Sequence, residues 1–120
     1  MYLEQQTSPN DTIAAIATAL GEGGIGILRI SGPQARSIAQ TVFRCTTDLA
    51  AWEPHRMYLG QCCDTSGAIL DEGLGVWMPK GRSYTGDDVI ELHMHGGRLN
   101  LLQILRVILD LGARPAQPGE

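Results

Sequence analysis

A short apolar strand preceded by glycines limits the folds that this chain can adopt. In the stretch GEGGIGILRISG, residues 21–32, Gly21, Gly23 and Gly26 match the G-x-G-x-x-G pattern of dinucleotide-binding folds. That pattern requires a strand before the first glycine and a helix that opens at the last one, where the pyrophosphate binds. Here the glycines precede the strand, and the helix is expected only after it. The sequence therefore argues against a dinucleotide-binding fold. It predicts a glycine loop that leads into a strand and whose backbone a ligand can approach closely.

The patterns along the chain predict an α+β fold, with a mostly antiparallel sheet and two main helices. Apolar residues alternate with polar ones in the strand candidates and recur at three- and four-residue spacing in the helix candidates. The stretch DTIAAIATAL, residues 11–20, fits either a helix or a strand. Residues 45–55 are expected to form a connecting loop. The other expected elements are strands at 27–30, 56–63, 68–78 and 88–95, of which the second and third form a hairpin, and helices at about 31–43 and 98–111.

Both expected helices carry signals for their ends and their buried faces. Ser31 and Gln34 have the spacing of a capping box, which predicts that Ser31 is the N-cap of the first helix. Gly112 is expected to end the second helix as its C-cap. The second helix is so apolar that it should be largely buried, in the core or against a partner. The predicted inner faces are Ala35, Ile38, Ala39, Val42 and Phe43 for the first helix and Leu101, Leu102, Leu105, Ile108 and Leu109 for the second.

Charge and composition narrow the functional classes. The chain has nine Lys and Arg against thirteen Asp and Glu, and its basic residues do not cluster, so this segment is not expected to bind RNA directly. No apolar run approaches the roughly 20 residues that span a bilayer, and the first residues lack the features of a secretory signal. Cys45, Cys62 and Cys63 are odd in number and lack C-x-x-C spacing, which fits inert thiols in a reducing cytosol. We therefore expect a cytoplasmic location without membrane contact.

The expected strand VIELHMH, residues 89–95, contains the side chains best suited to bind a metal ion or a ligand. Alternation places Val89, Glu91, His93 and His95 on one face of that strand. A carboxylate and two imidazoles are ligands that Zn²⁺ or Mn²⁺ accepts, although three ligands from one strand seldom complete a coordination sphere. The same face suits a ligand pocket in which Glu91 accepts two hydrogen bonds from a ring edge. A polar face that simply meets water is the third interpretation, and the residues alone leave all three open.

Two further groups have both a functional and a structural interpretation. Arg29, in the strand GILRIS, is either a fixed planar donor for a ligand carboxylate or carbonyl, or a strand residue that reaches solvent. Asp87 and Asp88, in the stretch YTGDD, are either a carboxylate pair for acid–base work or loop residues whose side chains accept backbone N–H groups.

Together these segments resemble the N-terminal domain of the MnmE (TrmE) family of tRNA-modification GTPases. The matching stretches are DTIAAIAT, GEGGIGILRISG, LDEGLGVWMP, SYTGDDVIELHMHGG and ARPAQPGE. The resemblance divides the chain into a flexible N-terminal tail, 1–10, and a folate-binding and dimerisation domain, 11–120. The family continues into a helical domain and a P-loop GTPase domain that these 120 residues lack. This segment by itself is therefore expected neither to hydrolyse GTP nor to modify tRNA.

The resemblance also implies a fold, a ligand and partners. The fold is one half of the tetrahydrofolate domain of glycine-cleavage aminomethyltransferases, and two such halves pair as a homodimer. The ligand is a 5-formyl-tetrahydrofolate-type one-carbon donor. Arg29 and Glu91 occupy folate-contacting positions of the family, and Gly23, Gly24, Gly26 and His95 are further candidates. The whole enzyme acts with the FAD-containing MnmG on the wobble uridine of tRNA, and tRNA contacts are expected outside this domain.

The resemblance assigns no catalytic residue and no metal ligand, and one departure from the family pattern concerns the site itself. Where family members often carry smaller residues before the HGG motif, this chain has His93 and Met94, which we expect to narrow the pocket. Two other functions fit the same sequence. One is a small metal-dependent enzyme that uses Glu91, His93 and His95. The other is a purely structural module that joins two subunits.

Overall fold

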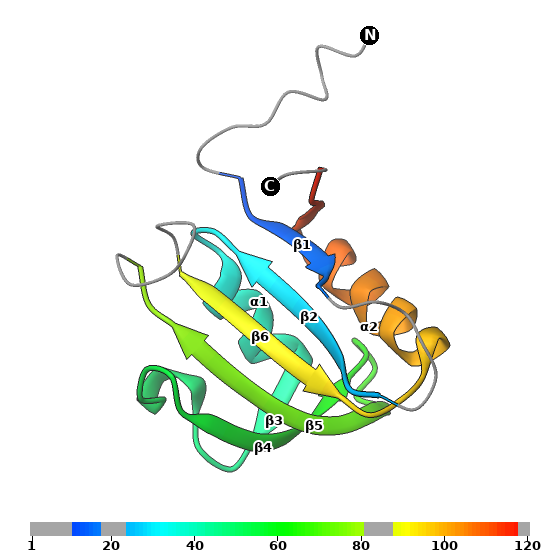
Figure 1. The fold of residues 1–120 in the computed structure, drawn as a ribbon, viewed down its shortest axis with the longest axis horizontal. Helices are drawn as coiled ribbons and strands as arrows, with labels where there is room; N and C mark the ends of the chain where they lie inside the picture. The colour runs from blue at the N-terminus through cyan, green and yellow to red at the C-terminus, as the bar shows by residue number, and fades with distance from the viewer. Residues whose placement is uncertain (1–10, 18–23, 81–87, 118–120) are drawn as a thin grey trace, which may run out of the picture.

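The computed structural model describes residues 11–17, 24–80 and 88–117, which form one sheet with two α-helices on the same side of it (Figure 1). The sheet contains seven strands in the order β3-β4-β5-β6-β2-β1-β7, and every neighbouring pair is antiparallel except β1 and β7. The predicted α+β fold is therefore confirmed. The strands are β1 (Ile13–Ile16), β2 (Gly26–Ser31), β3 (Phe43–Cys45), β4 (Met57–Cys63), β5 (Ile69–Met78), β6 (Val89–Met94) and β7 (Arg114–Pro115), and the helices are α1 (Ala35–Val42) and α2 (Arg98–Asp110).

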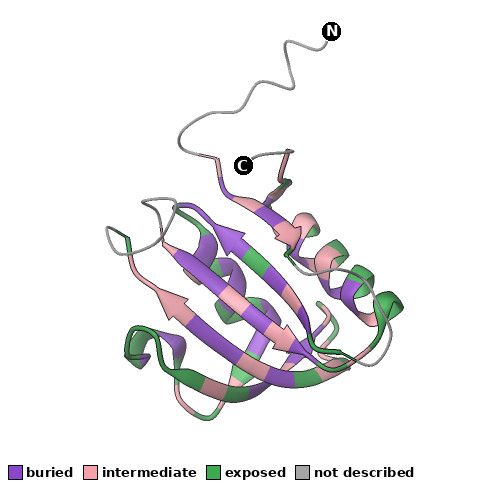
Figure 2. Ribbon diagram, in the orientation of Figure 1, coloured by how far each residue is buried: buried purple, intermediate pink, exposed green. Residues whose placement is uncertain are grey.

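The helices divide the sheet into a covered face and an open face. Leu28, Ile30, Ile90, Leu92 and Met94 are fully buried in the core beneath the helices. Figure 2 shows the resulting alternation of buried and more accessible residues along β2 and β6. Because successive strand residues point to opposite sides, Arg29, Glu91 and His93 lie on the open face, which neither α1 nor α2 covers. The candidate residues thus lie on the side of the sheet opposite the core that the helices cover.

The ambiguous segment near the N-terminus is a strand. Ile13–Ile16 forms β1 between β2 and the short β7, and Ala14 is buried in the core. Pairing on both edges outweighs the helix preference of its alanines, because strand propensity depends on the neighbours that a segment finds. Residues 18–23 lie outside the described residues.

The predicted capping box is wrong. Ser31 is the last residue of β2, where it pairs with Ile13 and Val89 in the adjacent strands. Helix α1 begins at Ala35, and its N-cap Gln34 makes no side-chain capping bond. Instead, the backbone N–H of Gln34 donates to the hydroxyl of Thr12, at 2.9 Å. The residue before α1 is thus held by Thr12, just before β1, a partner that local spacing does not reveal.

The connection after α1 contains more structure than expected. Phe43, which was placed on the inner face of the first helix, is buried but belongs to the edge strand β3. The expected loop 45–55 includes a short 3₁₀ turn, η2 (Leu49–Ala51), whose N-cap Asp48 accepts the N–H of Ala50. The hairpin of β4 and β5 and the strand β6 lie where the sequence predicted them.

Helix α2 is only partly buried, so its predicted inner face is wrong in part. Leu101, Ile104 and Ile108 are buried, whereas Leu102 is 41% exposed and Leu99 is 76% exposed. Apolar side chains occur on most sides of this helix, and periodicity alone could not select the side that meets the sheet. Gly112, with φ +123°, follows the helix as predicted. No helix in the described part of the chain has the length and apolarity needed to cross a membrane.

The three cysteines carry free thiols, of which those of Cys62 and Cys63 are buried. Burial raises the pKa of Cys62 to about 12, and the nearby Asp71 and Cys63 contribute in the same direction. A thiol with such a pKa is protonated at neutral pH, and Cys62 lies fully buried in the core, as a packing residue would.

Candidate functional site

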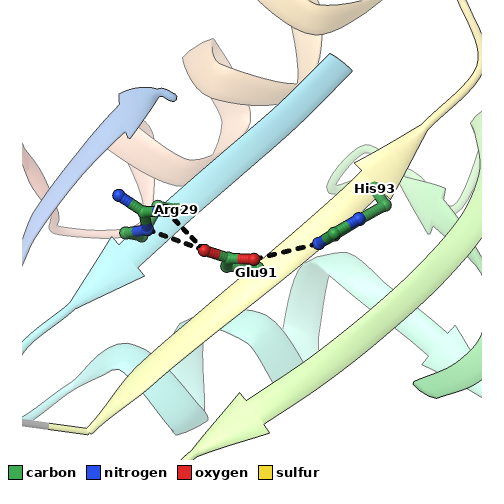
Figure 3. Close-up of polar contacts among 3 residues, drawn as sticks. All are labelled: Arg29, Glu91 and His93. Atoms are coloured by element: carbon green, nitrogen blue, oxygen red, sulfur yellow. Dashed lines mark hydrogen bonds and ion pairs between the residues drawn. The ribbon is translucent and has the colours of Figure 1, made fainter. Parts of the chain in front are cut away.

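Three polar side chains meet on the open face of the sheet, where β2 and β6 run side by side (Figure 3). Arg29 and Glu91 are direct cross-strand partners. The Nε and Nη2 atoms of Arg29 donate to Oε2 of Glu91 at 2.8 and 2.6 Å. Nε2 of His93, two residues further along β6, lies 3.0 Å from the other oxygen, Oε1. Both carboxylate oxygens are therefore held, one from each strand. We call these three residues the open-face triad.

Apolar side chains border the open-face triad on both sides. In β5, Val76 lies opposite Glu91 and Leu74 opposite His93, and in β2, Ile27 lies opposite His93. Cross-strand partners share a face of the sheet, so these three residues surround the polar centre. A few fixed polar groups bordered by apolar side chains can contact a flat ligand that has one polar edge.

The surroundings of Glu91 keep its carboxylate ionised. Its side chain is 13% exposed, whereas that of Arg29 is 47% exposed. Burial by itself would raise the pKa of Glu91, but the hydrogen bonds and charge of Arg29, together with those of His93, outweigh burial and lower it. Glu91 is thus an acceptor-only group at neutral pH, and Arg29 retains N–H groups that do not point at Glu91.

This lowered pKa predicts a pH dependence of stability. A carboxylate whose pKa is lower in the folded state stabilises the fold above its ordinary pKa of 4.5 and loses that contribution as pH falls through the folded value. The difference in unfolding free energy between the wild type and Glu91→Gln should therefore shrink as pH falls from 7 through this window. Urea denaturation at pH 7 and at several acidic pH values measures it. A difference that is constant with pH would contradict the role of the ion pair.

The remaining site candidates lie elsewhere or outside the described residues. Gly26 opens β2 on the covered face, and a Cβ added there would collide with the side chain of Leu101 in α2. Its lack of a side chain thus allows the helix to approach the strand. A Cβ added at Gly24 would meet no atom within 4 Å. Gly23, like Gly21, lies outside the described residues.

His95 does not join the open-face triad. Strand β6 ends at Met94, and Nδ1 of His95 lies 3.1 Å from the backbone carbonyl oxygen of Glu72 in β5. Among the described residues, no three His, Cys, Asp or Glu side chains form a group that could hold a metal ion. The described residues therefore offer no ligand group for the alternative function, a metal-dependent enzyme.

Asp88 has a structural role, as one of its two interpretations predicted. Its Oδ1 accepts the backbone N–H of Lys80 at 2.7 Å, and its carbonyl oxygen accepts the N–H of Gly32 at 3.0 Å. These bonds tie the start of β6 to the end of β5 and to the turn after β2. Asp87 lies outside the described residues.

The sequence did not reveal the apolar border of the site or the contact between His93 and Glu91. Alternation placed Glu91 and His93 on one face, which was a usable signal, but neither the metal alternative nor the expected narrowing of the pocket by His93 predicted this contact. Leu74 and Val76 enter the site through the register of β5 on β6, and no local pattern encodes that register.

Comparison with known proteins places this chain in a family. The family described as "GTP-binding protein TrmE N-terminus" matches residues 12–120. The tRNA modification GTPase MnmE of Geobacter sulfurreducens is 49% identical over 121 residues, which cover 100% of this chain and 25% of the relative. The protein of that name from Synechococcus sp. (strain JA-3-3Ab) is 52% identical over 112 residues, covering 92% of this chain and 24% of its own length. The chain thus spans about a quarter of the length of these relatives, and over nearly all of its own residues it belongs to the TrmE N-terminal family.

Proposed function

We propose that this chain binds a 5-formyl-tetrahydrofolate-type one-carbon donor at the open-face triad and serves the modification of tRNA. The observation that carries the ligand proposal is the ionised, largely buried Glu91, whose two oxygens are oriented from neighbouring strands. The names of the relatives, which are tRNA modification GTPases, support the proposed process.

The chemistry of a pterin matches the groups on this face. A pterin presents N3–H and a 2-amino group side by side, and one carboxylate can accept hydrogen bonds from both. Glu91 is the acceptor in this arrangement, and Arg29 donates to the ring carbonyl or to a carboxylate of the same ligand. Ile27, Leu74 and Val76 supply apolar contacts to the flat ring.

The partners follow from the same proposal. Two copies of the chain pair so that each contributes half of a folate-binding unit that resembles the tetrahydrofolate domain of aminomethyltransferases. Met57 and Leu59 of β4 support pairing, because they share the open face with Val76 and Leu74 and are 42% and 63% exposed. The full-length protein contacts tRNA and an FAD-containing MnmG in the cytoplasm through other parts of the molecule.

Isothermal titration calorimetry with 5-formyl-tetrahydrofolate tests the ligand proposal, on a chain shown by sedimentation to be dimeric. The wild type should give saturable binding. Glu91→Ala should weaken it by about 10-fold or more, because a hydrogen bond to a charged group contributes roughly 1.5–3 kcal/mol. Glu53→Ala is the matched control, since it removes a carboxylate whose side chain is 70% exposed.

Two results would contradict the ligand proposal. The first is a dimeric wild type that binds no folate, which would favour the purely structural pairing module. The second is binding that Glu91→Ala and Glu53→Ala leave equally unchanged.

A further inference from the structure

We infer that His93 is a positioning residue that fixes the orientation of the Glu91 carboxylate, and that it thereby sets the preference of this site for ligands with two adjacent N–H donors. The inference rests on the proposed function for the identity of the ligand. It rests on the geometry of the open-face triad for the role of the histidine.

The two partners of Glu91 hold different oxygens. Arg29 directs both of its donors to Oε2, and within the described residues the side-chain contact of Oε1 is with Nε2 of His93. Rotation of a carboxylate about its last torsion is a soft motion with no steep staggered wells. Arg29 binds only one oxygen and therefore restricts this rotation weakly. His93, which contacts the other oxygen, restricts it further.

The two partners also differ in how firmly they are held. The side chain of His93 is 21% exposed and lies between Ile27 and Leu74 on the adjacent strands, whereas that of Arg29 is 47% exposed on a long flexible stem. An ionised carboxylate only accepts hydrogen bonds, so Nε2 of His93 carries the proton in this contact. His93 is thus the fixed donor of the pair.

The number of hydrogen bonds that Glu91 can accept explains why it matters which of its two partners can move when a ligand binds. A carboxylate offers about four lone-pair positions, and Arg29 and His93 together fill three of them. A ligand with two adjacent N–H groups must therefore displace a donor, and the exposed guanidinium is the one that can swing away. His93 keeps the carboxylate in place while Arg29 turns to an acceptor on the ligand.

Titration of the Glu91 carboxyl by ¹³C NMR tests the contact in the ligand-free chain. His93→Ala should raise the pKa of Glu91, and His93→Gln should restore much of the lowering, because the Gln amide can donate from the position of Nε2. His55→Asn is the matched control, since it removes an exposed imidazole at a positive φ that Asn tolerates. A Glu91 pKa that is the same in the wild type and His93→Ala would overturn the inference. Thermal melting of each variant confirms that it is folded.

Binding of two ligands tests the consequence for specificity. The wild type should bind 5-formyl-tetrahydrofolate about 10-fold or more tightly than its 2-deamino analogue, which lacks one of the paired donors. His93→Ala should reduce this ratio to below about threefold, and His93→Gln should restore it. An unchanged ratio in His93→Ala overturns the inference. If the wild type binds neither compound, the folate proposal fails by that result, and the role of His93 is then decided by the NMR titration.

Discussion

Gly32→Ala is expected to lower the free energy of unfolding by about 3 kcal/mol or more, since it combines backbone strain with a collision. Gly32 has φ +134° in the turn between β2 and α1. A Cβ added there would lie 2.6 Å from Cα of Thr12 and 2.7 Å from the carbonyl oxygen of Asp11. These are backbone atoms directly before β1, which cannot move without disturbing the sheet. Urea denaturation with linear extrapolation measures the loss.

Gly67→Ala separates the two causes. Gly67 also has a positive φ, +93°, in the turn between β4 and β5, but a Cβ added there meets no atom within 4 Å. Its substitution should therefore cost only the backbone strain, about 1–2 kcal/mol. If the two variants lose equal stability, the contact of Gly32 with β1 carries no cost and the explanation for its larger effect is wrong.

The strands β2, β4, β5 and β6 were predictable because their signal is local, whereas β1, β3 and β7 were not predicted as strands. Alternation in residues 88–95 and in the hairpin depends only on neighbouring residues, and β4, β5 and β6 lie where that pattern placed them. The start of α1 was not predictable in the same way. The N–H of its N-cap Gln34 donates to Thr12, which lies 22 residues earlier and reaches it because β1 pairs with β2.

The candidate site shows the same division between local and long-range information. Alternation predicted that Glu91 and His93 share a face, and the structure confirms it. The pairing of Arg29 with Glu91 joins residues 62 positions apart, and the register of β2 on β6 that creates it has no signature in either segment. His95 left the predicted set because β6 ends one residue before it.

Gly26 is the last glycine of the pattern that resembles a dinucleotide-binding motif, and packing explains why it is a glycine. Gly26 lies on the covered face, where Leu101 occupies the space that a Cβ would need. Arg29, three residues later, lies on the open face because the strand alternates. One short strand thus brings α2 against the core and presents the guanidinium of the site on its other side.

Ile104→Ala should destabilise the fold by about 2–5 kcal/mol, because it removes a fully buried side chain and leaves a cavity. Ile104 is 0% exposed in the core that α2 shares with the sheet. The predicted inner face of the second helix did not include Ile104, so the expected loss depends on the orientation of α2 that the structure shows. Urea denaturation of the variant and the wild type at the same pH measures it.

Leu99→Ala, in the same helix, is the matched control for that orientation. Leu99 is 76% exposed, so its truncation should change the free energy of unfolding by less than about 0.5 kcal/mol. Both substitutions place Ala in α2, where it is a good helix former, so helix propensity does not account for a difference between them. A large loss in Leu99→Ala with a small one in Ile104→Ala would mean that α2 meets the sheet with its other side. Leu101 of α2 fills the space beside Gly26 that a Cβ would need. If α2 met the sheet with its other side, Leu101 would not lie there, and the packing reason for a glycine at this position would be lost.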